Sequence, residues 1–129
     1  MRGQVLREPP AAPAWTHFVV QAVVLFDTAE AASQFQFRSR QDWEGCSDRE
    51  LRYAQQLAPD QIWSVGPVSA DGDALTISRS QRSPQQWFCQ RALGVRGNAA
   101  VDVEACSAEG PTSAAAAIVR AISERFPAA

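Results

Sequence analysis

The chain has 129 residues, of which 46% are hydrophobic and 20% are charged, and its formal net charge at pH 7 is -2. This length suits a single domain, and the composition is typical of a globular protein rather than a disordered one. The small net charge gives no support for a nucleic-acid partner or for binding to an acidic membrane surface. The chain has no lysine, and its arginines are scattered, so no basic patch is readable.

The start of the chain is predicted to be a flexible lead. Residues 8–14 (EPPAAPA) are rich in Pro and Ala, as extended linkers are. We therefore divide the chain into a lead over residues 1–14 and one domain over residues 15–129. Residues 1–7 lack the apolar core of a signal peptide, and no apolar run approaches the ~20 residues that span a bilayer. Either the chain is cytoplasmic or an export signal lies upstream of it.

The first half of the domain is predicted to contain two strands and a helix. A valine-rich segment from His17 to Phe26 predicts a strand. A helix is expected over residues 28–39, because Asp27 and the glutamate three residues later resemble a capping box. We expect residues 41–48 to form a loop and residues 49–56 to form a second strand. The apolar face of the helix would consist of Ala31, Ala32, Phe35 and Ser39.

A hairpin is predicted over residues 61–81, because Asp71-Gly72 is a strong two-residue turn signal. A turn centred on these two residues sets Val68 opposite Leu75. This register leaves Trp63 off the apolar face of the hairpin, where it could form part of a binding surface.

A second hairpin is predicted over residues 86–106, with its turn at Gly97-Asn98. Glycine at the first turn position suits a type II′ turn. This turn sets Arg91 opposite Glu104. One face of the hairpin is then apolar, with Phe88, Ala92, Val101, Val103 and Ala105. The other face carries Cys89, Arg91, Leu93, Asp102, Glu104 and Cys106.

A final helix is predicted over residues 112–126, with Thr112 or Ser113 as its cap and Pro127 as its stop. Its apolar stripe would consist of Ala115, Ile118, Ile122 and Phe126. The order of the elements predicts an α+β fold, with an antiparallel sheet of about five to six strands and two main helices packed on its apolar face. The second, partly polar face of the sheet would be exposed and available for binding.

The cysteines bear on the location of the protein. The second hairpin sets Cys89 opposite Cys106 in a non-hydrogen-bonded pair, where the Cα atoms lie about 4.5 Å apart, within reach of a disulfide. We favour this disulfide, with two free thiols in a reducing cytosol or a metal site as the alternatives. Persistent disulfides are typical of exported proteins, so the pairing predicts an extracytoplasmic location. Cys46 would then be unpaired or form an intermolecular bridge.

The sequence offers ligand contacts but no catalytic constellation. His17, the only histidine, has no Ser, Cys or carboxylate at the spacing of a triad or a metal site. Arg91 and Glu104 are expected to form a cross-strand ion pair, and Asp102 projects from the same face. We expect no catalytic residue, no metal and no cofactor. The tentative ligand contacts are Arg91, Glu104, Asp102 and Trp63.

An ordered set of segments resembles a known family. The segments are AVVLFDTAEAA at residues 22–32, WEGC at 43–46, IWSVGPV at 62–68, CQRAL at 89–93 and RGNAAVDVEAC at 96–106. Together with the alanine-rich last helix, the set is similar over residues 19–126 to the PknH-like extracellular sensor domain of mycobacteria. That domain lies outside the membrane on certain receptor serine/threonine kinases, and it also occurs in secreted proteins and lipoproteins.

The resemblance implies an antiparallel sheet with helices, a cleft for an unidentified ligand, and two disulfides from four cysteines. This chain has only three cysteines. Cys89 and Cys106 match one pair, and the resemblance implies that the partner of Cys46 belongs to a further region before the first strand. We therefore expect this chain to lack an N-terminal part of the domain. No kinase motif occurs in the chain, so any kinase would be tethered from elsewhere.

These observations predict a non-catalytic extracytoplasmic sensor domain that binds a small-molecule or cell-envelope ligand and is secreted, lipid-anchored or membrane-tethered. A first alternative is a protein-interaction or structural module of the cell envelope, which would show an apolar surface patch or dimerise. A second is a small cytoplasmic enzyme, which would require free thiols and a pocket with perturbed acids. We expect a homodimer if the absent region normally covers apolar surface.

Overall fold

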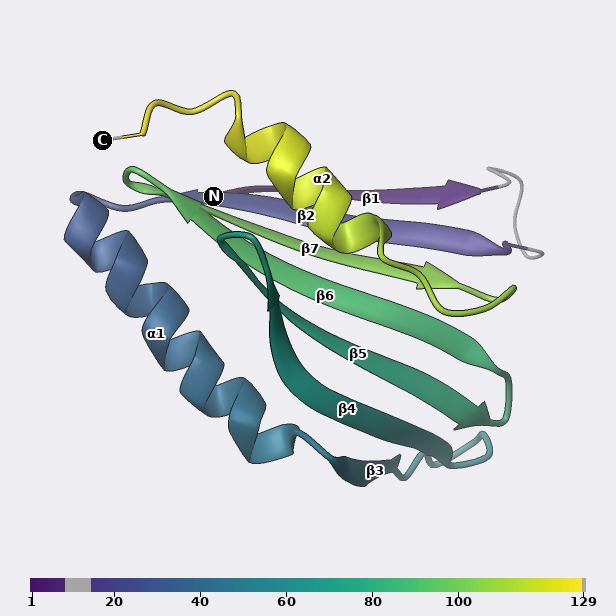
Figure 1. Ribbon diagram of the computed structural model, residues 1–129. Coiled ribbons are helices and arrows are strands. Elements are labelled where there is room, and N and C mark those ends of the chain that lie inside the picture. Colours follow the sequence, from purple (N-terminus) through teal and green to yellow (C-terminus); the bar gives the residue numbers. More distant parts are fainter. Residues whose placement is uncertain (9–14, 129) are drawn as a thin grey trace.

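The structure is a computed structural model that describes residues 1–8 and 15–128. It is a seven-stranded antiparallel sheet with two helices, and the strands lie in the order β1-β2-β7-β6-β5-β4-β3 (Figure 1). The strands are β1 (Arg2–Glu8), β2 (His17–Leu25), β3 (Arg49–Tyr53), β4 (Gln61–Asp71), β5 (Ala74–Ser83), β6 (Trp87–Arg96) and β7 (Ala99–Ser107). The helices are α1 (Ala29–Cys46) and α2 (Ala114–Ser123).

The α+β class is confirmed, but the sheet has seven strands rather than five to six. The additional strand is β1, which pairs with β2 from Arg2 opposite Val23 to Glu8 opposite His17. The prediction of a flexible lead is therefore wrong for residues 2–8. Their sequence does not alternate between apolar and polar residues, and the ladder that β2 offers sets their conformation instead. Residues 9–14 of the predicted lead lie outside the described residues.

The β6–β7 hairpin has the predicted register. Gly97 has a φ of 58°, as the first position of a type II′ turn requires, and Arg96 lies opposite Ala99. Cys89 and Cys106 are paired and form a disulfide, with their Cα atoms 4.1 Å apart. In the chain-entropy model, a loop of this length contributes about 3 kcal/mol of stability. The turn and the disulfide therefore fix the centre of the sheet together.

The β4–β5 turn lies one residue later than predicted, at Gly72-Asp73. A type II′ turn needs a positive φ only at its first position, and Gly72 has a φ of 61°. A type I′ turn centred on Asp71-Gly72 would require a positive φ at Asp71. A positive φ costs more free energy at an aspartate than at a glycine. As a result, Val68 faces Ile77 and not Leu75.

An irregularity in β4 between Val65 and Val68 changes which side chains share a face. Before it, Trp63 lies opposite Gln81, and after it, Val68 lies opposite Ile77. Odd-numbered residues before the bulge and even-numbered residues after it therefore point the same way. Trp63 is only 7% exposed, so its predicted place off the apolar face is wrong.

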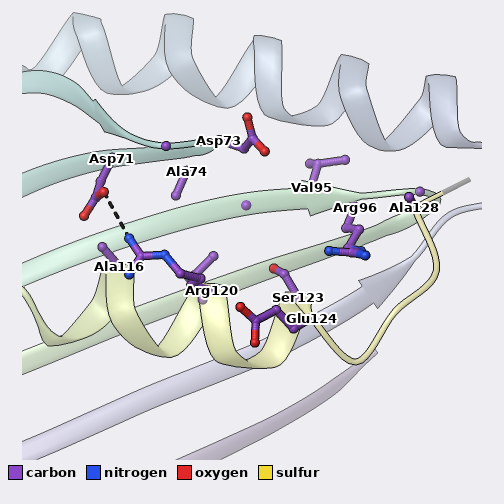
Figure 2. Close-up of a pocket in the computed structure, with 14 residues that line it drawn as sticks. Asp71, Asp73, Ala74, Val95, Arg96, Ala116, Arg120, Ser123, Glu124 and Ala128 are labelled. Atoms are coloured by element: carbon purple, nitrogen blue, oxygen red, sulfur yellow. Dashed lines mark hydrogen bonds and ion pairs between the residues drawn. The ribbon is translucent and has the colours of Figure 1, made fainter.

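The two helices cover opposite faces of the sheet, and the prediction of both on one face is wrong. Side chains alternate along β7, so Val101 and Ala100 point to opposite faces. One buried cluster packs against α2, and another contains Trp43 of α1; in Figure 2, the strands pass between the two helices. Both faces of β6 and β7 carry apolar side chains, and each therefore needs a cover. The α2 cluster is Ala74, Ala92, Val101, Val103, Ala105, Ala115, Ala116 and Val119. The α1 cluster is Trp43, Leu75, Leu93 and Ala100.

Helix α1 is longer than predicted and has a different cap. Thr28, not Asp27, caps it, because the Thr28 hydroxyl accepts a hydrogen bond from the Ala31 N–H at 3.0 Å. The helix continues to Cys46 through the segment predicted to be a loop. Trp43 continues the apolar face at helical spacing and is 8% exposed, so its burial holds the last turns against the sheet.

Helix α2 is shorter than predicted, and its N-cap Ser113 makes no side-chain capping bond. The Thr112 hydroxyl instead accepts a hydrogen bond from the Ala114 N–H. The helix approaches β6 closely at Gly94, where a Cβ atom would lie 2.5 Å from Val119 Cγ1. A larger residue at this position would overlap Val119, so only glycine fits without a shift of the helix.

Replacing Gly94 by alanine should lower the free energy of unfolding by about 1–3 kcal/mol, because the methyl group would push α2 away from the sheet. Gly45→Ala is the matched control, since nothing lies within 4 Å of a Cβ at that helical position. It should leave stability unchanged or raise it by up to ~1 kcal/mol. Urea unfolding measures both; equal effects of the two variants would contradict the close approach.

Candidate functional site: the groove beside α1

A groove of about 650 Å³ opens between α1 and the sheet, and we call it the α1 groove. Its wall is the face of α1 that continues from Phe35 to Cys46, and its floor is the α1 face of β5, β6 and β7. It includes three of the four predicted ligand contacts. The lining residues are Val20, Ala22, Phe35, Ser39, Asp42, Trp43, Cys46, Leu51, Val65, Ile77, Arg79, Arg91, Asp102 and Glu104.

Arg91 and Asp102 form one ion pair of the floor. The Arg91 guanidinium donates from Nε to Asp102 Oδ1 at 3.0 Å and from Nη2 to Oδ2 at 2.7 Å. These hydrogen bonds raise the pKa of Arg91 above its usual value, so the guanidinium stays charged. Its Cζ lies 5.0 Å from the ring centroid of Trp43, which brings the guanidinium to the helix wall.

Arg79 and Glu104 form the second ion pair. The Arg79 guanidinium donates from Nε to Glu104 Oε2 at 3.2 Å and from Nη2 to Oε1 at 2.9 Å. Because Arg79 lies on β5 and Glu104 on β7, this pair reaches across β6. The Arg79 Cζ lies 4.1 Å from the ring centroid of Trp63. Each arginine is thus held by a carboxylate and an indole ring.

The predicted register of Arg91 and Glu104 is confirmed, but the predicted ion pair between them is wrong. The two residues lie directly opposite each other, as the turn predicts. Each side chain instead bonds diagonally, Arg91 with Asp102 and Glu104 with Arg79. The bidentate geometry explains this, because a planar guanidinium needs a carboxylate that it can meet side-on.

Sequence reasoning missed Arg79 and placed Trp43 in a loop. The signal that could have found Arg79 is its spacing from Ile77, because residues two apart in a strand point to the same face. Trp63 supports the floor from a cluster of buried residues that includes the disulfide, rather than lining the groove. Cys46 is free and exposed, and it lies at the rim where α1 ends.

The groove has the chemistry of a binding site with fixed polar groups. Its two arginines and two floor carboxylates neutralise each other, and Asp42 adds one carboxylate from the wall. Each guanidinium has five N–H donors and uses two of them here, so donors remain for a ligand. Among the described residues, no three His, Cys, Asp or Glu side chains gather in a way that could hold a metal ion.

His17 lies at the start of β2, outside the groove lining. Its Nδ1 is 3.0 Å from the Thr16 hydroxyl, and its Nε2 is 3.6 Å from a Glu109 carboxylate oxygen. Both side chains of the His17–Glu109 pair are largely exposed. This geometry fits the prediction of a strand-edge histidine.

A second pocket, of about 520 Å³, lies where the β4–β5 and β6–β7 turns meet α2 (Figure 2). Arg120 of α2 donates to Asp71 at 3.1 Å across its mouth. The buried Nε of Arg96 has no hydrogen-bond partner among the described residues. Asp73 and Glu124 also line this pocket, so charges of both signs are mixed there. None of the predicted ligand contacts lies in it.

Comparison with known proteins identifies the family. The family described as the PknH-like extracellular domain matches residues 1–125. The chain belongs to this family. The match confirms the resemblance, and it begins at residue 1 rather than at residue 19 because β1 is part of the domain.

Relatives include the serine/threonine-protein kinase PknH of Mycobacterium bovis and of Mycobacterium tuberculosis H37Rv. Each is 34% identical to this chain over 92 residues, which is 71% of this chain but only 15% and 14% of the two kinases. The crystal structure of the extracellular domain of PknH from M. tuberculosis has a TM-score of 0.83 and 31% identity. That match covers 95% of this chain and 61% of the solved chain.

The family assignment confirms the extracytoplasmic location predicted from the cysteines, because the PknH-like domain is an extracellular domain. The disulfide that carried this prediction is present in the structure. Within the described residues, neither helix has the length and apolar character needed to cross a bilayer.

Arg79→Met should lower the free energy of unfolding by about 1–2 kcal/mol, because it leaves the half-buried Glu104 carboxylate without its partner. Arg79→Met with Glu104→Met should recover most of this loss, since the unpaired charge is then removed. Arg52→Met is the control: its ion pair with Asp60 is largely exposed, and its loss should cost within ~1 kcal/mol. Urea unfolding compares the three, and no recovery in the double variant would contradict the pairing.

Proposed function

We propose that this chain is a non-catalytic ligand-sensing domain whose ligand binds in the α1 groove. One observation supports this most: two arginines, each fixed by a carboxylate and an aromatic ring, lie on the floor of one concave site. Small-molecule sites typically enclose about 300–1,000 Å³ and combine apolar walls with a few fixed polar groups. The α1 groove has both properties.

The lining indicates the kind of ligand. The remaining guanidinium N–H groups of Arg79 and Arg91 favour acceptor oxygens, such as hydroxyl, carbonyl or carboxylate groups. Phe35, Trp43 and Val20 favour a ring or an apolar chain on the same molecule. A small component of the cell envelope with both parts fits this combination and the extracellular location.

Binding would be transmitted through α1. The helix rests on the sheet through Trp43, and the side-chain amide of Gln36 donates to the carbonyls of Asp73 and Leu93 at 3.2 and 2.8 Å. A ligand that touches both the helix wall and the sheet floor would favour one position of α1 over others. By analogy with PknH, the receiver would be a kinase or a membrane anchor tethered to this domain.

An enzymatic role has less support. Asp102 and Glu104 are the paired carboxylates that could carry acid–base chemistry, but each is engaged by two hydrogen bonds from an arginine. A carboxylate in that state serves to position its partner rather than to exchange protons with a substrate.

The test blocks the groove without disturbing the fold. Ser39 lines the groove, whereas Ser33 lies on an exposed face of α1, so Ser39→Trp should fill the site and Ser33→Trp is the matched control. The probe is a set of water-soluble fractions of mycobacterial cell wall, and native mass spectrometry detects what stays bound. We expect a compound retained by the wild type and by Ser33→Trp, and bound about tenfold more weakly or not at all by Ser39→Trp. Equal retention by all three proteins would overturn the proposed site.

A further inference from the structure

Strand β1 forms one edge of the sheet, and no described strand pairs with its outer side. Two of its large apolar side chains are exposed, Val5 at 47% and Leu6 at 45%. Natural proteins usually protect such an edge with proline, with bulges or with a covering element. Arg2–Glu8 contains no proline, and it pairs with β2 without a register shift. This edge therefore offers a regular template for another strand.

The backbone groups that face outward can be derived from the ladder. The Ala108 N–H donates to the Thr16 carbonyl at 2.8 Å, and these two residues lie opposite each other at the start of the β2–β7 ladder. Hydrogen-bonded pairs recur at every second residue, so the even-numbered residues of β2 bond to β7. Odd-numbered residues of β2 therefore bond to β1, where their partners are even-numbered. The outward N–H and C=O groups of β1 are thus those of Gly3, Val5 and Arg7.

We propose that the outer edge of β1 binds β1 of a second copy of this chain, antiparallel and centred on Val5, to form one continuous sheet across a two-fold axis. This inference stands independently of the α1 groove. In this register the hydrogen-bonded pairs are Val5 with Val5 and Gly3 with Arg7 in both directions, so every outward group is matched.

Hydrogen-bond matching selects this register. Residues that face each other in a ladder point to the same face, so the two-fold axis must lie between the two copies of one residue of β1. Centring on Val5 gives Gly3, Val5 and Arg7 each a partner within the strand. Centring on Gln4 would leave Arg7 without a partner inside the strand, and centring on Leu6 would leave Gly3 without one. With Val5 at the centre, the two exposed Val5 side chains meet at the axis.

Cysteine cross-linking tests the register, and Cys46→Ser provides a background without the free thiol. In the proposed dimer, the two Val5 Cα atoms lie about 5.5 Å apart, within disulfide range. Leu6→Cys is the matched control, because it is equally exposed but its two copies are diagonal, about 7–8 Å apart, and beyond that range. We expect Val5→Cys to form a covalent dimer under mild oxidation and Leu6→Cys to remain monomeric on a non-reducing gel. Equal cross-linking of both, or of neither, would overturn the proposal.

Equilibrium sedimentation of the unmodified chain provides the second measurement. Val5→Pro removes the central outward N–H but leaves the bonds between β1 and β2, since the Val5 N–H does not face β2. We expect the wild type to associate reversibly to a dimer, and Val5→Pro to weaken the association about tenfold or more. A wild type that stays monomeric at high concentration, or a Val5→Pro variant that dimerises equally well, would overturn the proposal.

Discussion

The rest of the structure depends on the register of the β6–β7 hairpin. The Gly97-Asn98 turn and the Cys89–Cys106 disulfide fix this register at its two ends, so a slip by one residue would break the covalent pairing and reverse every side chain. This register determines three surfaces: the apolar surface under α2, the apolar patch under Trp43, and the charged floor of the α1 groove. The α1 groove and the core are two consequences of one constraint.

The two helices use their faces of the sheet differently. α2 packs tightly, because Gly94 leaves room for Val119 and the alanines of the helix add little bulk. α1 meets the sheet through a larger anchor, Trp43, and the space between the helix and the strands stays open. This asymmetry separates a tightly packed face from a face that carries the α1 groove within one small domain. It also explains why the ion pairs remain partly exposed: they lie on a floor that no apolar side chain covers.

The register of a hairpin could be predicted from the sequence only where two independent signals agreed. For the second hairpin, the turn residues and the cysteine spacing gave the same register, so the disulfide and the shared face of Arg91, Asp102 and Glu104 were predicted correctly. For the first hairpin, the Asp-Gly and Gly-Asp dipeptides overlap at Gly72, and no second signal chose between them. That ambiguity set Val68 opposite the wrong residue. The face of Trp63 was wrong for a separate reason, the irregularity in β4 between Val65 and Val68, which no sequence signal marked.

The remaining errors concern long-range contacts. β1 forms because β2 offers its edge, and nothing in RGQVLRE itself specifies a strand. The partners of the ion pairs depend on the β5–β6 register, which places Arg79 within reach of Glu104 across β6 and which no short turn encodes. The opposite placement of the helices follows from apolar residues on both faces of the central strands, and single-face reasoning could not recognise it. Local patterns therefore identified most elements, whereas tertiary pairing decided how the site was assembled.

The most direct measurement is the intact mass after alkylation, with and without prior reduction, of protein made in an oxidising compartment. We expect a single cysteine, mapped to Cys46, to be alkylated without reduction and all three cysteines to be alkylated after reduction. Alkylation of Cys89 and Cys106 without reduction would contradict the register on which both the core and the α1 groove depend.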